Sequence, residues 1–373
     1  MWKILSLVLF AVVICSSAND DITHKKHILP KPYINVMESS NEFWNSKAQN
    51  YLKGKLNEKL NTNKAKNVIM FIGDGMSLTT LAATRMYMGS EQTQLSFEKF
   101  PHFGLSKTYC VDAQVADSAC TSTAYLNGVK ANSGTMGVNA KVKKGNCVVD
   151  KATYTESIAS WAQKSCKSAG LVTTTRVTHA SPGGLYSHTA HRDWENDAAI
   201  NIACEGTDQK PMDIAHQLIY NDESKNFRVI LGGGRREFIN TTVTDEEGLP
   251  GKRSDGRNLI HEWKEARSKK GKARYIWNKH QLNDIDIEKT DYLLGLFEND
   301  HCMYNLDITN NDLQEEPSLT DMTVAAIKML SKDDNGYFLF VEGGRIDMAH
   351  HGKIILNISE ETPVFIISFK FNK

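Results

Sequence analysis

One serine stands at the start of a predicted helix, directly after an aspartate. In "ADSACTSTAY", residues 116–125, Ser118 opens a stretch that predicts a helix running to about Gly128. A hydroxyl in that place is commonly an N-cap. The free backbone N–H groups and the helix dipole also favour an anion there, so a serine that becomes a phosphate ester would be stabilised. Because no GxSxG elbow surrounds Ser118, we expect a metal ion to activate this weak nucleophile.

Residues suited to metal binding follow two predicted strands. Asp74 follows the apolar run in "NVIMFIGDGMS", and Glu342 ends the run in "GYFLFVEGG", where a buried carboxylate needs a partner or a cation. Asp347 and His351 are four residues apart, so a helix beginning near Arg345 would place both on one face, which suits zinc. Ordinary alternatives are a turn residue or helix cap for Asp74 and a helix-surface pair for Asp347 and His351.

A third group of polar residues lies in "RVTHASPGGLYSHTAHRDW". It contains His179, Ser181, His188, His191 and Arg192. Taken alone this group is a weak signal, because most exposed histidines have no special role.

The strands that must position these residues are apolar runs without alternation. Such runs end near residues 73, 177, 234 and 344, with helical stretches between them. They predict an α/β fold, a doubly wound and mostly parallel sheet with helices on both faces. Functional groups in such sheets gather at the carboxyl ends of the strands, which is where the unusual residues lie. Residues 19–66 predict an N-terminal helical arm, and residues 243–275 predict an exposed excursion.

Composition and the first residues indicate a folded, secreted chain. The 44 Lys and Arg balance the 44 Asp and Glu, which argues against nucleic acid as a partner. Residues 1–18 predict a signal peptide, cleaved after Ala18. Six of the seven cysteines then remain, and fifteen pairings are open to them. Sequons at Asn240 and Asn357 are candidates for N-glycosylation.

Several motifs in a fixed order carry a family resemblance. They are "FIGDGM", "VADSACTSTAYLNGVKAN", "VTTTRVTHASPGGLYSHTAHRDW", "LGGGRREF", "YLLGLFE" and "VEGGRIDMAHH", between Asn67 and His351. Together they resemble the alkaline phosphatases of the animal secreted or membrane-anchored type. The resemblance implies hydrolysis of phosphate monoesters, on small molecules or phosphoproteins, with two Zn²⁺ and one Mg²⁺. It also implies a homodimer, and relatives are often held at the cell surface by a GPI anchor.

The resemblance assigns roles to the residues that match. Ser118 would be the nucleophile and become a phosphoserine, Arg192 would hold two phosphate oxygens, and Asp117 would orient Arg192. The implied metal ligands are Asp74, Ser118, Ser181, Glu342, Asp347 and His351, with His179 close by. Asp74 would bridge the second zinc and the magnesium, and Asp347 and His351 would bind the first zinc. An accessory Ca²⁺ site would use Phe297, Glu298, Glu316 and one of Glu246 and Glu247, and a disulfide would join Cys147 to Cys204.

The sequence also departs from the family pattern. Met348 stands where relatives usually have a histidine, and no histidine follows His351. The pattern stops after "HHGK", which predicts a truncated domain at 67–352 and a divergent tail at 353–373 without a GPI signal. The first zinc would then keep two protein ligands. The alternative function is therefore a catalytically impaired secreted remnant that at most binds metal or phosphate. A sulfatase or phosphodiesterase on the same fold is a further rival, although "DSACTST" does not resemble a sulfatase motif.

Overall fold

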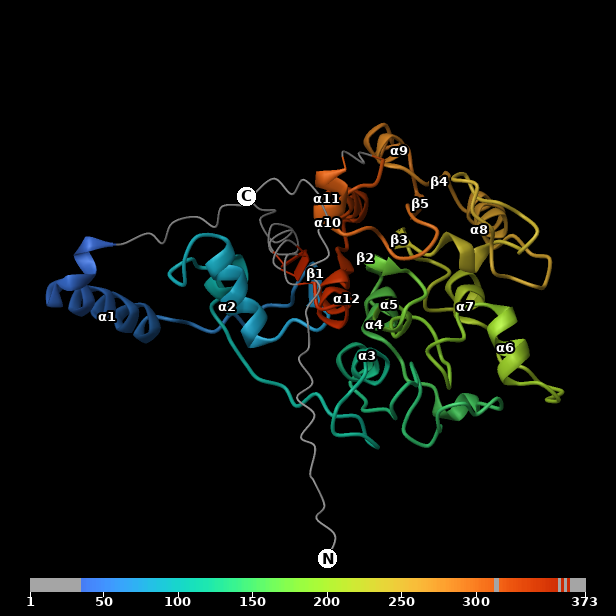
Figure 1. The fold of residues 1–373 in the computed structure, drawn as a ribbon, viewed down its shortest axis with the longest axis horizontal. Helices are drawn as coiled ribbons and strands as arrows, with labels where there is room; N and C mark the ends of the chain where they lie inside the picture. The colour runs from blue at the N-terminus through green and yellow to red at the C-terminus, as the bar shows by residue number, and fades with distance from the viewer. Residues whose placement is uncertain (1–34, 312–314, 355–356, 359–360, 363–373) are drawn as a thin grey trace, which may run out of the picture.

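The computed structural model describes residues 35–311, 315–354, 357–358 and 361–362. The predicted signal peptide at 1–18, the arm up to residue 34 and the other tail residues lie outside the described part. Figure 1 shows the sheet and its helices on one side and the helix of the arm on the other.

The centre of the fold is a parallel sheet with the strand order β1-β6-β2-β3-β5-β4. Its strands are β1 (Val68–Gly73), β2 (Ser168–Arg176), β3 (Val229–Gly233), β4 (Ala273–Ile276), β5 (Tyr292–Leu296) and β6 (Tyr337–Gly343). The α/β prediction is confirmed. Alternate residues of the central strands enter two different cores: Phe338 and Phe340 of β6 pack into one, and Leu339 and Val341 into the other. Burial on both faces explains the unbroken apolar runs.

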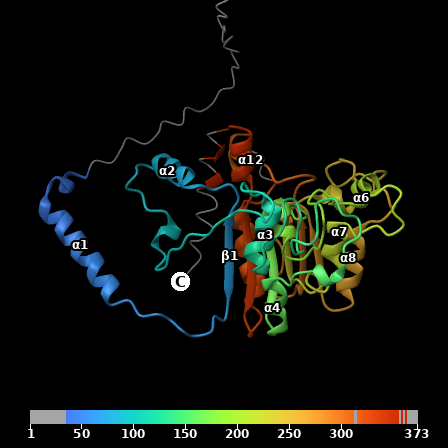
Figure 2. The same cartoon turned by 90° about the horizontal axis from the view of Figure 1, so that it is seen from below.

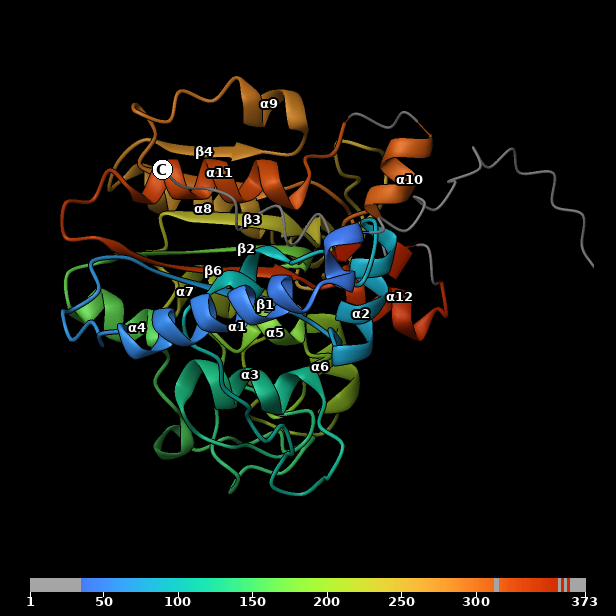
Figure 3. The ribbon, with the colours of Figure 1, turned by 90° about the vertical axis from the view of Figure 1, so that its left-hand side faces the viewer.

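The described residues also form α-helices, several of which pack on the two faces of the sheet. They are α1 (Asn41–Leu56), α2 (Leu78–Tyr87), α3 (Ser118–Asn127), α4 (Ile158–Lys164), α5 (Ala180–Gly183), α6 (Asp197–Ala203), α7 (Ile214–Tyr220), α8 (Leu259–Ser268), α9 (Lys279–Asn283), α10 (Asn305–Asn310), α11 (Leu319–Leu330) and α12 (Arg345–His351). Four short 3-10 helices are η1 (Val36–Ser39), η2 (Ser96–Lys99), η3 (Lys151–Thr153) and η4 (Arg235–Phe238). Figure 3 shows α11 and α9 on one side of the sheet and α3, α4 and α5 on the other.

The prediction of an exposed excursion at 243–275 is wrong in its second half. Residues 259–268 form α8, and residues 273–276 form β4 at the sheet edge. Leu259 and Trp263 of α8 are 0% exposed and pack into the core under the sheet. Away from this buried face, α8 carries exposed charged residues such as Lys264 and Glu265, and its high charge hid an amphipathic helix.

The arm forms a helix that stands apart from the sheet. Ser40 caps α1, and none of the residues of α1 is buried. Figure 2 shows α1 beyond β1, joined to it by an extended segment. Lys55 Nζ donates a hydrogen bond to the Pro101 carbonyl oxygen at 3.1 Å and so ties the arm to the segment before α3. Within the described residues, no helix combines the length and the apolar character that crossing a membrane requires.

Candidate active site

Ser118 is the first residue of α3, and its hydroxyl points away from the helix. The N-cap is Asp117, whose side chain accepts a hydrogen bond from the Cys120 N–H. The interpretation of Ser118 as the N-cap is therefore wrong. Ser118 Oγ instead donates to the Asp74 carboxylate, at 2.9 Å from Oδ2 and 3.2 Å from Oδ1. The hydroxyl thus lies at a helix N-terminus, where an anion is favoured, and beside a carboxylate.

Asp74 comes directly after β1 and faces the site. Ser77 caps the following helix α2, so Asp74 does not serve as its cap. Burial, together with the nearby Asp347 carboxylate, raises the pKa of Asp74 to about 6, although the Ser118 hydroxyl and Arg192 oppose the rise. Two carboxylates this close repel each other, and a divalent cation would relieve that repulsion.

Gly75 allows Asp347 to approach the loop that carries Asp74. Gly75 has φ +64°, and a Cβ there would lie 2.5 Å from Asp347 Oδ1. Asp347 and His351 share one face of α12, with 3.5 Å between Oδ2 and Nε2. The His351 side chain is 82% exposed, and within the described part of the chain Asp347 is its one ion-pair partner. His350 points elsewhere and bonds to Thr80 Oγ1 at 2.9 Å.

Glu342 lies near the end of β6 and is fully buried. Its Oε2 accepts hydrogen bonds from Thr173 and Thr175, but Oε1 is buried and has no hydrogen-bond partner within the described residues. Burial, together with the Asp74 carboxylate, raises the pKa of Glu342 to about 7. An orphaned, buried carboxylate oxygen beside a second carboxylate fits a hard divalent cation such as Mg²⁺.

Arg192 is held between a carboxylate and an imidazole. Its Nη1 donates to Asp117 Oδ2 at 3.1 Å, and its Nη2 lies 3.1 Å from His179 Nε2. Burial lowers the pKa of His179 to about 3, so the ring is neutral and Nε2 accepts from the guanidinium. Burial opposes ionisation of Asp117, but the Gly134 N–H and Arg192 outweigh it and lower the pKa of Asp117.

The other histidines of the "RVTHASPGGLYSHTAHRDW" stretch lie outside this arrangement. His188 is buried, stacks on Tyr154 and places Nδ1 2.6 Å from the Gly137 carbonyl oxygen. His191 stacks on Trp194. Both have structural partners, whereas His179 and Arg192 face the site.

Two residues of α3 that sequence reasoning missed join Ser118 to the cation site. Ser122 Oγ donates to the Ala180 carbonyl oxygen of α5 at 3.1 Å. Tyr125 lies within hydrogen-bonding reach of Ser181, and burial and the Glu342 carboxylate raise the pKa of its hydroxyl. The sequence did contain a pattern that could have identified these two residues, because Ser118, Ser122 and Tyr125 have the i, i+4, i+7 spacing of one helix face.

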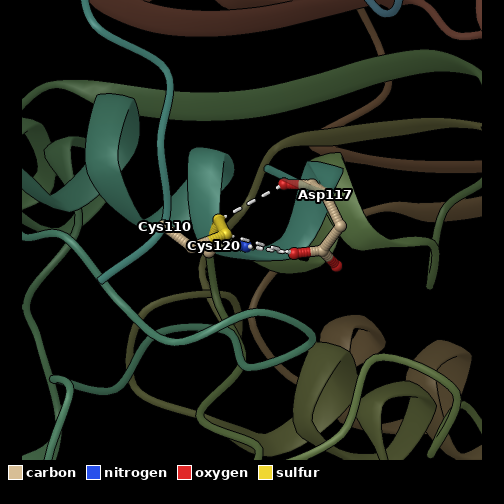
Figure 4. Close-up of side chains that lie close together, drawn as sticks. All are labelled: Cys110, Asp117 and Cys120. Carbon is tan, nitrogen blue, oxygen red and sulfur yellow. Dashed lines mark hydrogen bonds between the residues drawn. A yellow bond between two sulfur atoms is a disulfide. The ribbon is translucent and has the colours of Figure 1, made fainter. Parts of the chain in front are cut away.

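Two disulfides form among the described cysteines. One joins Cys147 to Cys204, the pairing that the resemblance implied, and the other joins Cys110 to Cys120. Cys166 is free and exposed, and Cys302 is free and buried. Cys110, Asp117 and Cys120 lie close enough together to suggest a metal site (Figure 4), but two sulfurs joined to each other are not thiolate ligands.

The residues of the predicted calcium site also come together. Phe297 follows β5, and burial and the Glu247 carboxylate raise the pKa of Glu298. Burial and the neighbouring Glu298 raise the pKa of Glu316 well above its usual range. Of the two candidates for the fourth ligand, Glu247 is the one that acts on Glu298, although Arg235 pairs with both Glu246 and Glu247.

The two sequons differ in their accessibility. Asn240 is half-buried, and its Oδ1 accepts a hydrogen bond from Thr242 Oγ1 at 2.7 Å. Asn357 is 6% exposed. Asn240 is therefore the better candidate for glycosylation.

These elements meet at the carboxyl edge of the sheet. Asp74 follows β1, Glu342 lies in the adjacent β6, and His179 follows β2 on the other side of β6. A serine at a helix N-terminus, an arginine and a cluster of carboxylate and imidazole groups, set at this edge, form the kind of arrangement that metal-dependent phosphohydrolases use.

The chain belongs to the alkaline phosphatase family, whose family model matches residues 65–365. It is 49% identical to the membrane-bound alkaline phosphatase of Bombyx mori over 84% of this chain and 59% of that relative. It thus spans about three fifths of that relative's length. The solved Thermus thermophilus alkaline phosphatase superposes with a TM-score of 0.65 at 26% identity, over 83% of this chain and 56% of that one. A TAB5 alkaline phosphatase mutant solved with Mg bound superposes at 0.59 with 22% identity, over 82% of this chain and 71% of that one.

Proposed function

We propose that the protein hydrolyses phosphate monoesters and takes the phosphoryl group on Ser118. The observation that carries this proposal is the hydrogen bond from Ser118 Oγ to Asp74 at the start of α3, with Arg192 close by. Ser118, Asp74 and Arg192 are all half-buried, so a substrate has access to them. Phosphorylated small molecules and phosphoproteins are the proposed substrates. The predicted signal peptide at 1–18 supports action outside the cell, and a homodimer is the assembly that the sequence resemblance implies.

The chain's own residues would bind and orient the phosphoryl group. Arg192 would hold two phosphate oxygens, while Asp117 and neutral His179 keep its guanidinium in place. Asp74 orients the Ser118 hydroxyl, and the phosphoserine would face the free N–H groups of the first turn of α3. Attack by Ser118 Oγ breaks the bond from phosphorus to the alcohol oxygen. Water would then release phosphate and restore Ser118.

Divalent cations belong to this proposal because of the carboxylates described above. Asp74, Ser181 and Glu342 would hold Mg²⁺, and Asp347 and His351, with Asp74 and Ser118, would hold the two Zn²⁺. When bound, these ions supply Lewis acidity at the reacting oxygens. Glu298, Glu316 and Glu247, with Phe297, would hold Ca²⁺, whose charge would offset three neighbouring carboxylates.

A second candidate is a chain that binds phosphate or metal and turns substrate over poorly. Within the described residues, each proposed zinc site has two protein ligands, and protein zinc sites normally have three or four. The high exposure of His351 favours this candidate as well.

The test is turnover of p-nitrophenyl phosphate at alkaline pH by residues 19–373, supplied with Zn²⁺ and Mg²⁺. We expect Ser118→Ala to abolish turnover. The same substitution should abolish the phosphoserine peptide that is recovered when the wild-type reaction is stopped with acid. Ser40→Ala, which removes the N-cap of the distant α1, should leave both unchanged. Turnover that survives Ser118→Ala contradicts the proposal. If the wild type shows no turnover and metal analysis finds less than one zinc per chain, the second candidate, a chain that turns substrate over poorly, is selected.

A further inference from the structure

A disulfide encloses the nucleophile segment. It joins Cys110, in the irregular segment before α3, to Cys120, in the first turn of α3, and the interval contains Asp117 and Ser118. Both cysteines are 2% exposed. Figure 4 shows the disulfide against Asp117. Cys110 Sγ lies 3.8 Å from Asp117 Oδ1, and Cys120 Sγ lies 3.5 Å from the Asp117 carbonyl oxygen. The bridge therefore contacts both the side chain and the main chain of Asp117.

Asp117 connects the start of α3 to the phosphate-binding arginine. Its Oδ1 accepts from the Cys120 N–H at 3.4 Å and from the Gly134 N–H at 3.0 Å, and its Oδ2 pairs with Arg192. The Arg192 N–H also donates to the Gly134 carbonyl oxygen at 2.8 Å. A displacement of Asp117 would thus change the position of Ser118 and of Arg192 together.

The disulfide, a small apolar cluster around it that includes Ala113 and Ala131, and a few hydrogen bonds hold the segment that carries Cys110. Its large side chains have little cover; the most exposed are Phe103, Leu105 and Val115, at 87%, 85% and 88%. The Val111 N–H donates to the Ala131 carbonyl oxygen at 2.9 Å, and Asp112 accepts from the Ser133 N–H at 2.8 Å. Both bonds lead to the short stretch 131–133 just before Gly134. The disulfide therefore closes a ring that includes Gly134, which also binds Asp117.

We propose that the Cys110–Cys120 disulfide is a positioning element for phosphate binding, because it fixes Asp117 between the first turn of α3 and the Arg192 guanidinium. The proposal rests on the proposed function, in which Ser118 and Arg192 act on one phosphoryl group. Without the bridge, the first turn of α3 can shift relative to Arg192. Groups that must act together lose much of their effect when they are displaced by a fraction of an ångström.

The experiment compares two variants of the full chain, each lacking one disulfide. One is Cys110→Ser with Cys120→Ser, and the matched control is Cys147→Ser with Cys204→Ser. With Zn²⁺ and Mg²⁺ present, affinity for inorganic phosphate is measured by calorimetry at a temperature where circular dichroism shows both variants folded. We expect the affinity to fall on the order of tenfold in the first variant and to stay unchanged in the control. Unchanged affinity in the first variant, or an equal fall in both, overturns the proposal.

Hydrogen exchange separates this proposal from the proposed function. In the first variant alone, amides of residues 117–123 should exchange faster than in the wild type, whether or not the chain binds phosphate. A wild type that neither binds phosphate nor turns over substrate refutes the proposed function. Equal exchange in all three proteins refutes the positioning role.

Reduction provides a second route where the serine variant does not fold. A small dithiol reduces the Cys110–Cys120 bond to two thiols and itself becomes a cyclic disulfide. Alkylation and peptide mapping identify the bridge that opened. Phosphate affinity should fall when this bridge opens and return on reoxidation. Affinity that does not follow the state of this bridge contradicts the proposal.

Discussion

Gly75 sets how closely the loop that carries Asp74 approaches Asp347 of α12. Its φ of +64° is one that side chains rarely adopt, and a Cβ would lie 2.5 Å from Asp347 Oδ1 and 2.9 Å from Asp347 Cα. The contact with Cα is with backbone, which a rotamer change cannot relieve. Two separate physical reasons therefore require glycine next to Asp74.

We expect Gly75→Ala to lower the free energy of unfolding by about 2–4 kcal/mol, from the positive φ and the clash together. Binding of Mg²⁺ and Zn²⁺ should weaken as well, because Asp347 must move away from Asp74. Chemical denaturation measures the first effect and calorimetric titration the second.

The control for this substitution is Gly256→Ala. Gly256 has φ +77°, and nothing lies within 4 Å of the position that a Cβ would take. Its substitution should cost only about 1–2 kcal/mol for the backbone conformation and leave metal binding unchanged. Equal losses at both glycines would show that the approach of Asp347 is not what Gly75 provides.

The sequence could predict which residues belong to the site where the residue type allows only a few chemical roles. It could not predict how their side chains are oriented. Ser118, Asp74 and Arg192 were predicted, and the structure brings them together. An N-cap was the ordinary alternative for Ser118, because serine and aspartate both cap helices well. The backbone conformation decides which of the two residues is the cap, and Asp117 has the extended φ of −100° and ψ of 166° that an N-cap requires. Whether Asp74 turns toward Ser118 depends on contacts between distant segments.

At the level of elements, the crossing of α3 and α5 fixes the serine relative to the cation site. Ser122 of α3 bonds to Ala180 of α5, and a Cβ on Gly184 would lie 2.2 Å from Ser122 Oγ. The two helices can come this close because Gly184 has no side chain and Ser122 has a small one.

We predict that Gly184→Ala lowers the free energy of unfolding by about 1–3 kcal/mol, since the two helices must separate. The neighbouring Gly183→Ala should cost less than about 1 kcal/mol, because its nearest contact is the flexible end of Met136 at 3.2 Å. Thermal unfolding of the two variants compares them directly. A larger loss at Gly183 would contradict the close crossing.

Elements could be predicted where hydrophobicity dominates the local sequence. β2, β3 and β6 are apolar runs, and all of their residues but one are buried. β4 and α8 were missed, because β4 is a short edge strand with one fully buried residue and α8 has many charges. A pattern of partial burial resembles an exposed loop in sequence, and only packing distinguishes the two.

At the level of the whole molecule, β1 is the least protected strand of the site. Within the described residues it pairs with β6 alone, and none of its residues is fully buried, whereas all seven residues of β6 are. An edge strand with this cover opens more readily than a central one.

We therefore expect amides of residues 68–73 to exchange hydrogen about tenfold or more faster than those of residues 337–343. Exchange followed by mass spectrometry measures both segments in one experiment, and β2 on the other side of β6 serves as the protected reference. Slower exchange in β1 than in β6 would show that β1 has a cover beyond the described contacts.

The strand order and the Cys110–Cys120 pairing could not be read from the sequence. Fifteen pairings were open to six cysteines, and spacing does not choose among them. Likewise, an apolar run predicts a strand without naming its neighbours. Both depend on contacts between residues far apart in the chain.

The pairing of β1 with β6 also determines when the site can exist during synthesis. Ile72 lies opposite Glu342, and Gly73 lies opposite Gly343. The first strand of the sheet therefore cannot pair until the last strand has been synthesised. The ribosome must therefore release nearly all of the described chain before Asp74 meets Glu342 and Asp347. A nascent chain that already carries Ser118 and Arg192 therefore lacks the carboxylate neighbours of Asp74 until β6 and α12 have emerged.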